Sequence, residues 1–357
     1  MTRIERLQQQ LPILYLDALL VTDATNIFYL TGFSLTAGDG ALLITATQAI
    51  LVTDDRYAQA LREFATTEVT GLITRDYYGS INELLEKQGL MVLGFETSLS
   101  YEVYDQLDEL MTADLVPCRG LIEQARAEKD SHEVAKLRAA AQLHDQAFEY
   151  LLGILQPGLS EQAVANRLDF WMKEHGATAA SFPPIVASGP NAAKPHATVS
   201  PRKIAAGDVV TLDFGYWVDG YTADLTRTVA VGEPDFEFKA VYELVNQARQ
   251  AVIEKITAGA NGAALDAAGR QLIEAAGYGD EFQHGMGHGI GLTVHELPAS
   301  YGPATTQVRL KHNQVITVEP GIYLPGLFGV RIEDDVLVTH GGHEVLTHAP
   351  TELLVLK

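Results

Sequence analysis

The chain has 357 residues, of which 47% are hydrophobic and 20% charged, a composition typical of a globular protein long enough for two domains. It carries 25 Lys and Arg against 46 Asp and Glu, a formal charge of −21, which is the opposite of the basic footprint of nucleic-acid binding. Cys118 has no second cysteine to pair with, the N-terminus does not resemble a signal peptide, and no apolar run approaches the ~20 residues that span a bilayer. We therefore expect a cytoplasmic protein that binds neither nucleic acid nor membrane.

The first part of the chain alternates between strand-like and helix-like segments. Amphipathic runs such as Asp55–Glu63 and Ile81–Gln88 predict helices, and apolar runs between turn signals predict strands. The strands are expected at Ala18–Thr22, Gly40–Ile44, Ala49–Thr53 and Met91–Phe95. This alternation predicts an α/β domain, and its sequence contains neither a phosphate loop nor a dinucleotide-binding fingerprint.

A charged segment without aromatic residues, Glu123–His132, follows this domain. Within it, Asp130 and Glu133 have the spacing of a capping box, which predicts the start of a new helix. We expect the first domain to cover residues 1–126 and the second to cover residues 127–357.

The second domain contains two similar halves. Ile154–Glu161 resembles Lys255–Gly262, and the two segments lead into amphipathic helices expected at Glu161–Glu174 and Ala263–Ala275. A repeat of roughly 100 residues is too long for a solenoid unit. We therefore expect one domain built from two halves about a pseudo-twofold axis, with a site between them.

The first half contains a predicted hairpin that carries two acidic residues. Val209–Phe214 and Thr222–Val231 have the composition of strands, and Asp219–Gly220 between them is a strong turn signal. The turn lies near the midpoint of Asp213 and Asp224. We expect these carboxylates to come close to facing each other across adjacent antiparallel strands.

The second half repeats this arrangement. Val315–Pro320 and Gly329–Val338 are predicted strands, and Pro325–Gly326 marks the midpoint of Glu319 and Glu333. Like charges placed together repel, and burial costs several kcal/mol per ion unless something compensates. Protonation of one acid could compensate, but four carboxylates suit two divalent metal ions with bridging oxygens. Four solvated acids at strand ends are the alternative.

Histidine supplies the remaining ligand type. The glycine-rich stretch Phe282–Glu296 holds His284, His288 and His295, and a fourth histidine, His196, lies upstream. The glycines argue against a regular helix and allow the backbone to approach a site closely. Three histidines in so short a stretch indicate a functional site.

These segments resemble the pita-bread metallopeptidases, which include methionine aminopeptidase, aminopeptidase P, prolidase and the metal-free creatinases. Residues 130–357 carry the resemblance, and residues 1 to about 125 resemble the N-terminal domain of the proline-specific and creatinase branches. The matching motifs are Leu212–Gly215, Ala223–Thr228, His284–Gly291, Val294–Glu296, Glu319–Tyr323 and Val330–Asp334. The resemblance implies an α/β N-terminal domain and an α+β pita-bread catalytic domain with an internal pseudo-twofold repeat.

The resemblance also implies a dinuclear metal site with five ligands. Asp213 would bind one ion through both oxygens, Asp224 and Glu333 would bridge the two ions, and His288 and Glu319 would complete the second site. Two divalent ions per chain are expected, with Mn2+ preferred on the hardness of the oxygen ligands and Co2+ or Zn2+ as alternatives.

In the implied mechanism a hydroxide that bridges the ions attacks the scissile carbonyl. His196, His284 and His295 match histidines that surround the metal ligands in the family. His196 and His295 would orient the substrate, stabilise the intermediate and transfer protons, and Glu319 would double as a proton carrier.

Two further residues are expected near the substrate. Arg331 shares a strand face with Glu333 and would hold a substrate carboxylate or backbone, or a neighbouring acid; a structural arginine is the alternative. Tyr323 matches a family position near the substrate pocket. The first domain, by resemblance, mediates homodimer contacts and covers the partner's active site.

The proline-specific branch cleaves Xaa-Pro bonds, at the N-terminus of peptides in aminopeptidase P and in dipeptides in prolidase. Thr25–Phe33, Asp54–Tyr57 and Gly285–Met286 are more similar to short bacterial aminopeptidase P, since many bacterial prolidases carry an arginine between the two histidines. A creatinase-like metal-free C–N hydrolase and a non-catalytic pita-bread binding protein are the alternatives. The complete ligand set and the acidic composition argue against both.

Overall fold

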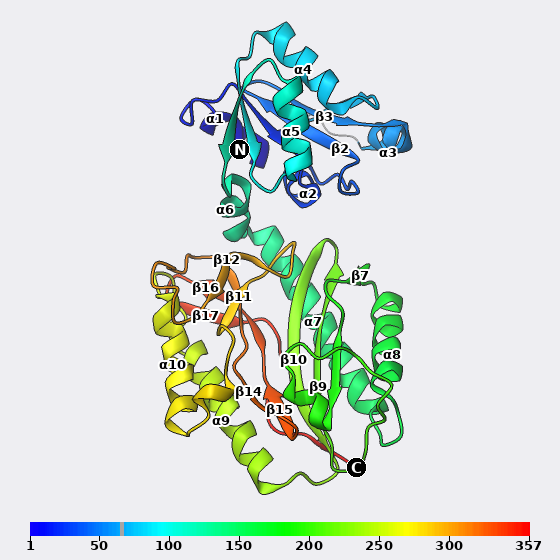
Figure 1. The fold of residues 1–357 in the computed structure, drawn as a ribbon, viewed down its shortest axis with the longest axis vertical. Helices are drawn as coiled ribbons and strands as arrows, with labels where there is room; N and C mark the ends of the chain where they lie inside the picture. The colour runs from blue at the N-terminus through cyan, green and yellow to red at the C-terminus, as the bar shows by residue number, and fades with distance from the viewer. Residues whose placement is uncertain (65–67) are drawn as a thin grey trace. The chain divides into compact units, whose positions relative to one another are not determined.

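The computed structural model describes residues 1–64 and 68–357, which separate into two compact units, Met1–Gln124 and Ala125–Lys357 (Figure 1). The first unit alternates strands and helices, and the second combines helices with antiparallel sheets. The chain therefore has the predicted combination of an α/β part followed by an α+β part.

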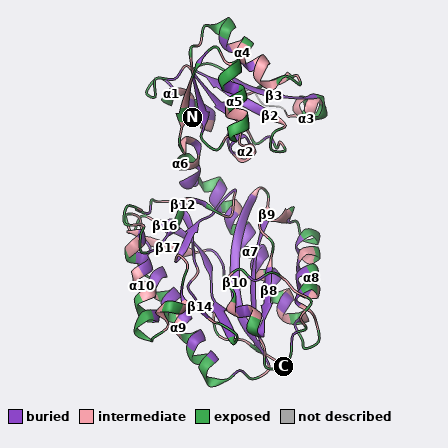
Figure 2. Ribbon diagram, viewed as in Figure 1, coloured by how far each residue is buried: buried purple, intermediate pink, exposed green. Residues whose placement is uncertain are grey.

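The N-terminal unit is built on a six-stranded mixed sheet with the strand order β4-β3-β2-β1-β5-β6. Its strands are β1 (Ala18–Val21), β2 (Gly40–Thr45), β3 (Ala49–Thr53), β4 (Thr70–Ile73), β5 (Val92–Glu96) and β6 (Asp114–Cys118). Its helices are α1 (Arg3–Gln10), α2 (Ala24–Thr31), the 3-10 helix η1 (Asp55–Tyr57), α3 (Ala58–Glu63), α4 (Tyr77–Gln88) and α5 (Tyr101–Leu110). Strands β1 to β3 are buried throughout, because both faces of the sheet are covered, and their sequences are accordingly continuous apolar runs (Figure 2).

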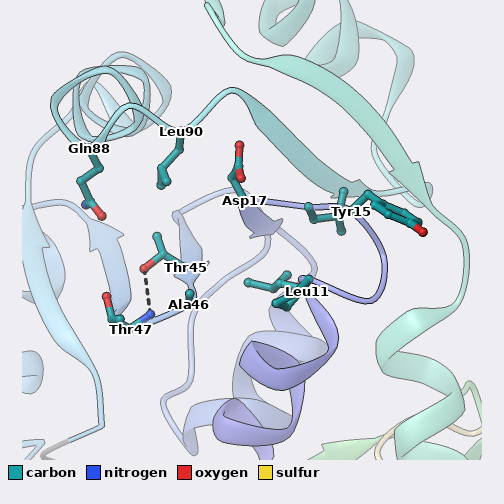
Figure 3. A pocket seen from close by; sticks show the side chains of 10 residues that line it. Leu11, Tyr15, Asp17, Thr45, Ala46, Thr47, Gln88 and Leu90 are labelled. Atoms are coloured by element: carbon teal, nitrogen blue, oxygen red, sulfur yellow. Dashed lines mark hydrogen bonds between the residues drawn. The ribbon is translucent and has the colours of Figure 1, made fainter.

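A cavity of about 470 Å³ opens in the N-terminal unit beside the end of α1 (Figure 3). Leu11, Thr45 and Leu90 are among the residues that line it. The lining carboxylate of Asp17 accepts hydrogen bonds from the backbone N–H groups of Met91 and Val92 at 2.8 and 3.0 Å. That acid is thus satisfied by the backbone, and we assign no chemistry to this cavity.

The C-terminal unit repeats one order of elements: two helices and then antiparallel strands (Figure 1). The helix α6 (Leu121–Ala127) leads into it. The first half contains α7 (Ser131–Ile154), α8 (Glu161–Glu174), β7 (Ala179–Ala180), β8 (Ile185–Ser188), the 3-10 helix η2 (Gly189–Ala193), β9 (Val209–Val218) and β10 (Tyr221–Val231). The second contains α9 (Phe236–Ile253), α10 (Gly262–Ala275), the 3-10 helix η3 (Gly279–Glu281), β11 (Gly287–Gly289), β12 (Glu296–Tyr301), β13 (Val315–Val318), β14 (Gly321–Leu324), β15 (Phe328–Arg331), β16 (Asp334–Thr339) and β17 (Gly342–Val345). A short β18 (Val355–Leu356) returns to β10.

Helix capping in this unit follows the sequence signals. Asp130 and Glu133 form the predicted capping box at the start of α7. Ser160 caps α8 and Asn261 caps α10, each through its side-chain oxygen. Both caps also form an isolated β-bridge, Ser160 to Lys203 and Asn261 to Arg309, so the two halves repeat in tertiary pairing as well as in element order.

Strands β9 and β10 form a long hairpin that is buried along most of its length (Figure 2). Asp219 and Gly220 have φ values of 50° and 82°, as a two-residue hairpin turn requires. This turn pairs Asp224 with Gly215, and pairs Asp213 with Thr226. The two acids are therefore diagonal neighbours on one face and not directly opposed, because the turn is centred between Asp219 and Gly220, slightly beyond their midpoint.

The second hairpin is bent, which corrects the prediction of one strand over Gly329–Val338. Strand β13 pairs with β16 and β14 pairs with β15, with Val318 opposite Asp334 and Gly321 opposite Arg331. The break contains Pro320, which has no N–H to offer a ladder. Beyond the break, the N–H of Glu333 donates to the carbonyl of Thr226 on β10 at 3.1 Å, which joins the two hairpins.

Candidate metal centre

The predicted ligands converge from both halves of the C-terminal unit. Asp213 lies on β9, Asp224 on β10 and His288 on β11, whereas Glu319 and Glu333 flank the break in the second hairpin. All five line one cavity of about 370 Å³. The same cavity is lined by four further predicted residues, His196, His284, His295 and Arg331, whereas Tyr323 is not among the described residues that line it.

Three of the five residues form the compact centre of the group. The donor atoms of Asp224, His288 and Glu333 all lie within 4.8 Å of one another, and all three side chains are buried. Glu319 is close to them, with its Oε1 3.6 Å from Nε2 of His288. Asp213 differs, because its Oδ2 is in contact with the guanidinium of Arg331.

The acids of this cluster disfavour one another's ionisation. Burial raises the pKa of Asp224 well above its usual range, and Glu333 and Asp213 add to the effect. Burial likewise raises the pKa of Glu333, with further contributions from Glu319 and Asp213. The pKa of Glu319 is raised to about 7, chiefly by burial. A divalent cation among these oxygens would reverse this repulsion, since it favours the ionised form of every acid around it.

Two details of the ligand atoms fit a cation. Asp224 Oδ1 is buried and has no hydrogen-bond partner among the described residues. His288 Nδ1 lies 3.1 Å from the carbonyl oxygen of Gly289, so this nitrogen carries the proton and Nε2 keeps its lone pair facing Asp224 and Glu319. Burial lowers the pKa of His288 to about 4, which keeps the ring neutral, as a metal ligand must be.

Arg331 and Tyr323 form a hydrogen-bonded chain beside the acids. The guanidinium of Arg331 contacts Asp213, donates to the hydroxyl of Tyr323 at 2.7 Å and donates to Thr226 Oγ1 at 3.2 Å. His284 Nδ1 lies 2.9 Å from the carbonyl oxygen of Gly285, so its Nε2 accepts from the Tyr323 hydroxyl at 2.9 Å. Of the alternatives for Arg331, this geometry matches the one in which it holds a neighbouring acid.

The two remaining histidines are exposed and line the cavity. His196 lies in the loop between η2 and β9, and His295 immediately precedes β12. The ring of His295 packs edge-on against His288 with 4.3 Å between ring centroids. Burial lowers the pKa of His295, and nearby His196 contributes, so the ring is neutral at neutral pH.

The glycines around His288 serve close packing of strands. A Cβ on Gly287 would lie 2.1 Å from the carbonyl oxygen of Thr317, and one on Gly289 would lie 2.5 Å from that of Leu297. Strand β11 can therefore fit between β12 and β13 because it lacks side chains at these positions. The glycines do allow a close approach of the backbone. They bring it close to neighbouring strands, whereas the prediction was a close approach to the site.

Two residues near the acids were missed by the sequence analysis. Thr226 Oγ1 donates to Glu333 Oε2 at 2.5 Å, and Asp335 Oδ2 accepts from the N–H of Asp224 at 3.1 Å. Thr226 lies two residues after Asp224 on the same strand face, so strand periodicity could have identified it. Asp335 could be identified only from the packing of β16 against β10, which the sequence pattern does not show.

A cluster of acids and one histidine on a duplicated hairpin frame defines a class of metallopeptidase. Residues 135–340 match metallopeptidase family M24, and residues 3–127 match the creatinase/prolidase N-terminal domain. The first match spans more than half of the chain. The chain therefore belongs to metallopeptidase family M24. The predicted resemblance and fold class are thereby confirmed.

Individual relatives agree with this assignment over the full chain. An uncharacterized peptidase, YqhT of Bacillus subtilis, is 40% identical, with 99% of this chain and 100% of that protein covered. The structure of an Xaa-Pro dipeptidase from Bacillus anthracis is 40% identical, with 99% of both chains covered and a TM-score of 0.93. An X-Pro aminopeptidase from Thermotoga maritima is 32% identical, with 99% and 100% covered and a TM-score of 0.91.

In the part of the chain that the structure describes, no helix is both long and apolar enough to cross a membrane.

Proposed function

We propose that this chain is an Xaa-Pro exopeptidase that works with two divalent metal ions, Mn2+ before Co2+ or Zn2+. The observation that carries the proposal is the buried cluster of Asp224, His288 and Glu333 at the wall of a cavity, in which Oδ1 of Asp224 has no partner among the residues that the structure describes. Buried acids that raise one another's pKa have no structural benefit of their own, whereas they suit a cation site. Similarity to an Xaa-Pro dipeptidase and an X-Pro aminopeptidase supports the substrate class.

We assign Asp213, Asp224, His288, Glu319 and Glu333 as the metal ligands. Ions bound there would lower the pKa of a water molecule between them and polarise the scissile carbonyl. Arg331 holds Oδ2 of Asp213, so binding of an ion through both oxygens of Asp213 requires the guanidinium to move away from that oxygen. Through Oδ1 alone, Asp213 can serve while Arg331 stays in place.

The protein's own groups then handle the substrate and its protons. Glu319 lines the cavity beside His288 and can accept and return a proton during hydrolysis. His196 and His295 are exposed to the cavity and can donate hydrogen bonds to substrate oxygens. The carbonyl of Gly285 fixes the tautomer of His284, whose Nε2 accepts from Tyr323 and whose pKa is lowered to about 3, chiefly by burial.

The binding surface combines these polar groups with apolar residues. Phe182, Ile185 and Val294 line the cavity and offer a surface for a proline ring. Arg331 is engaged by Asp213, Tyr323 and Thr226. We therefore assign His196 and His295, and not Arg331, to the substrate's carbonyl or free carboxylate.

The test is a product assay with Mn2+ on an Xaa-Pro dipeptide and an Xaa-Pro-Pro tripeptide, with the matching Xaa-Ala peptides as controls. Cleavage of the tripeptide establishes aminopeptidase P activity, and cleavage of the dipeptide alone establishes prolidase activity. If neither proline peptide is cut, the proposed specificity is wrong. Hydrolysis that persists without bound metal would favour a creatinase-like enzyme, and a metal-free inactive protein would favour a binding protein.

We further propose that the protein is cytoplasmic and forms a homodimer through its N-terminal unit. The free thiol of Cys118 suits a reducing compartment. The proposal of a dimer rests on the match to the creatinase/prolidase N-terminal domain. Light scattering that shows a fully active monomer would exclude the dimer.

A further inference from the structure

Glu296 directly follows the exposed histidine of the site, yet it is buried, with 3% of its side chain accessible. Its carboxylate turns away from the cavity: among the described residues, the cavity lining includes Val294 and His295 but not Glu296. Neighbouring side chains on one backbone segment thus point to opposite environments. The contacts of Glu296 show what its buried carboxylate does.

The carboxylate of Glu296 binds the backbone that precedes His295. Its Oε1 accepts the N–H groups of Leu292 at 2.8 Å and Thr293 at 3.1 Å. The hydroxyl of Thr293 donates to the carbonyl oxygen of His295 at 2.8 Å. Residues 292–296 are therefore closed into a small loop whose internal acceptor is the side chain of its last residue.

Two buried cations hold this carboxylate in place. Arg126, near the end of α6, contacts Oε1 of Glu296 and also donates to Thr293 Oγ1 at 3.3 Å. Lys129 Nζ lies 3.4 Å from Oε2, and its side chain is 1% accessible. Burial opposes ionisation of Glu296, but Lys129 and Arg126 outweigh it and hold the pKa of this acid below its usual value.

Gly291 shows how tightly the cluster is packed. A Cβ at Gly291 would lie 2.6 Å from Glu296 Oε2 and 3.0 Å from Lys129 Cε. The loop is also tied to the first hairpin, since Trp217 Nε1 donates to the carbonyl of Leu292 at 2.9 Å and the N–H of Thr222 donates to that of Gly291 at 2.8 Å. The backbone before His295 therefore has little freedom while the carboxylate is in place.

We propose that Glu296, held by Arg126 and Lys129, is a positioning residue that fixes His295 over the metal centre. His295 is exposed and its described ring contact is the one with His288, so its place depends on its backbone. This inference rests on the proposed function of His295 in hydrolysis. A displacement of about 1 Å can reduce turnover roughly 100-fold, which makes such a clamp consequential for catalysis.

The test compares wild type, Glu296→Gln, His295→Ala and the double variant, each loaded with Mn2+. Glu344→Gln is the matched control, because its carboxylate pairs with Arg138 at the surface. We expect Glu296→Gln to keep its metal while kcat falls roughly 10- to 100-fold, with KM changing in the same direction as in His295→Ala. We expect no additional loss when it is combined with His295→Ala, because both changes remove the same contribution.

Additive losses, or an unchanged kcat in Glu296→Gln, would overturn the inference. If Glu296→Gln does not fold, Thr293→Val replaces it, since that change leaves no buried charge uncompensated and should show the same non-additivity with a smaller loss. A crystal structure of either variant gives a reading that is independent of activity: His295 should leave its place against His288. If wild type cleaves no Xaa-Pro peptide, the proposed function fails, and an unmoved His295 in that crystal structure would separately refute the clamp.

Discussion

Glu319→Gln should stabilise the metal-free protein and destabilise the metal-bound one. The pKa of Glu319 is raised from 4.5 to about 7, chiefly by burial, with Asp213 adding to the effect against the opposing attraction of Arg331. Because the folded pKa exceeds the unfolded one, the favourable contribution of Glu319 is complete below pH 4.5 and is lost as the pH rises through 7. The shift corresponds to about 3 kcal/mol, so the metal-free wild type carries that penalty at pH 8.

The glutamine removes the charge and hence the penalty. In EDTA at pH 8 the variant should melt roughly 6–12 °C above wild type, and at pH 5 the gain should shrink to about 1 kcal/mol or less. With Mn2+ at about 1,000 times the wild-type Kd the order should reverse, because wild type then gains about 4.1 kcal/mol, which exceeds the variant's lead of about 3 kcal/mol, and the variant has lost a ligand. Differential scanning fluorimetry at both pH values measures these melting temperatures in EDTA and with Mn2+, with Glu344→Gln as the surface control. Identical melting of variant and wild type in EDTA at pH 8 would refute the electrostatic reasoning.

Four further substitutions separate the roles in the site. Asp224→Ala and Glu333→Ala should each lose bound metal and hydrolysis together, and full activity in either, with metal measured by inductively coupled plasma spectrometry, would contradict the ligand assignment. His295→Ala should retain its metal and lose roughly 10²–10⁴-fold in kcat, the range of general acid–base catalysis; loss of metal would mean that it is a ligand. Tyr323→Phe should keep its metal and lose about tenfold in kcat, since one hydrogen bond to Arg331 disappears, and an unchanged kcat would make that chain of contacts structural.

Local signals in the sequence were sufficient for the frame of the site. Turn residues, caps and strand composition predict the hairpins, and the duplicated acids predict four of the metal ligands that we propose. The register of the first hairpin was less certain, because the Asp219–Gly220 turn sets Asp224 opposite Gly215 and a shift of one residue in the turn changes every pair. The break at Pro320 and the partners of Arg331 depend on how the second hairpin packs against β10, which no local pattern encodes.

Several buried acids of the C-terminal unit fall into two groups that differ in what compensates their charge, and this difference supports the proposed metal centre. Glu296 lies against Arg126 and Lys129, and Asp334 against Arg227 and Arg249; in both, the cations outweigh burial and the pKa is lowered. Asp224, Glu319, Glu333 and Asp335 have raised pKa values, dominated by burial. Among the described residues, Oδ1 of Asp224 and Oδ1 of Asp335 in this second group are buried without a hydrogen-bond partner, as is Oε2 of Glu281 outside it. Cations of the chain itself thus compensate Glu296 and Asp334, and hydrogen bonds from Ser188 and Ser200 compensate the buried Glu161. Asp224, Glu319 and Glu333 line the cavity instead, where the proposed metal ions would be their compensating partners.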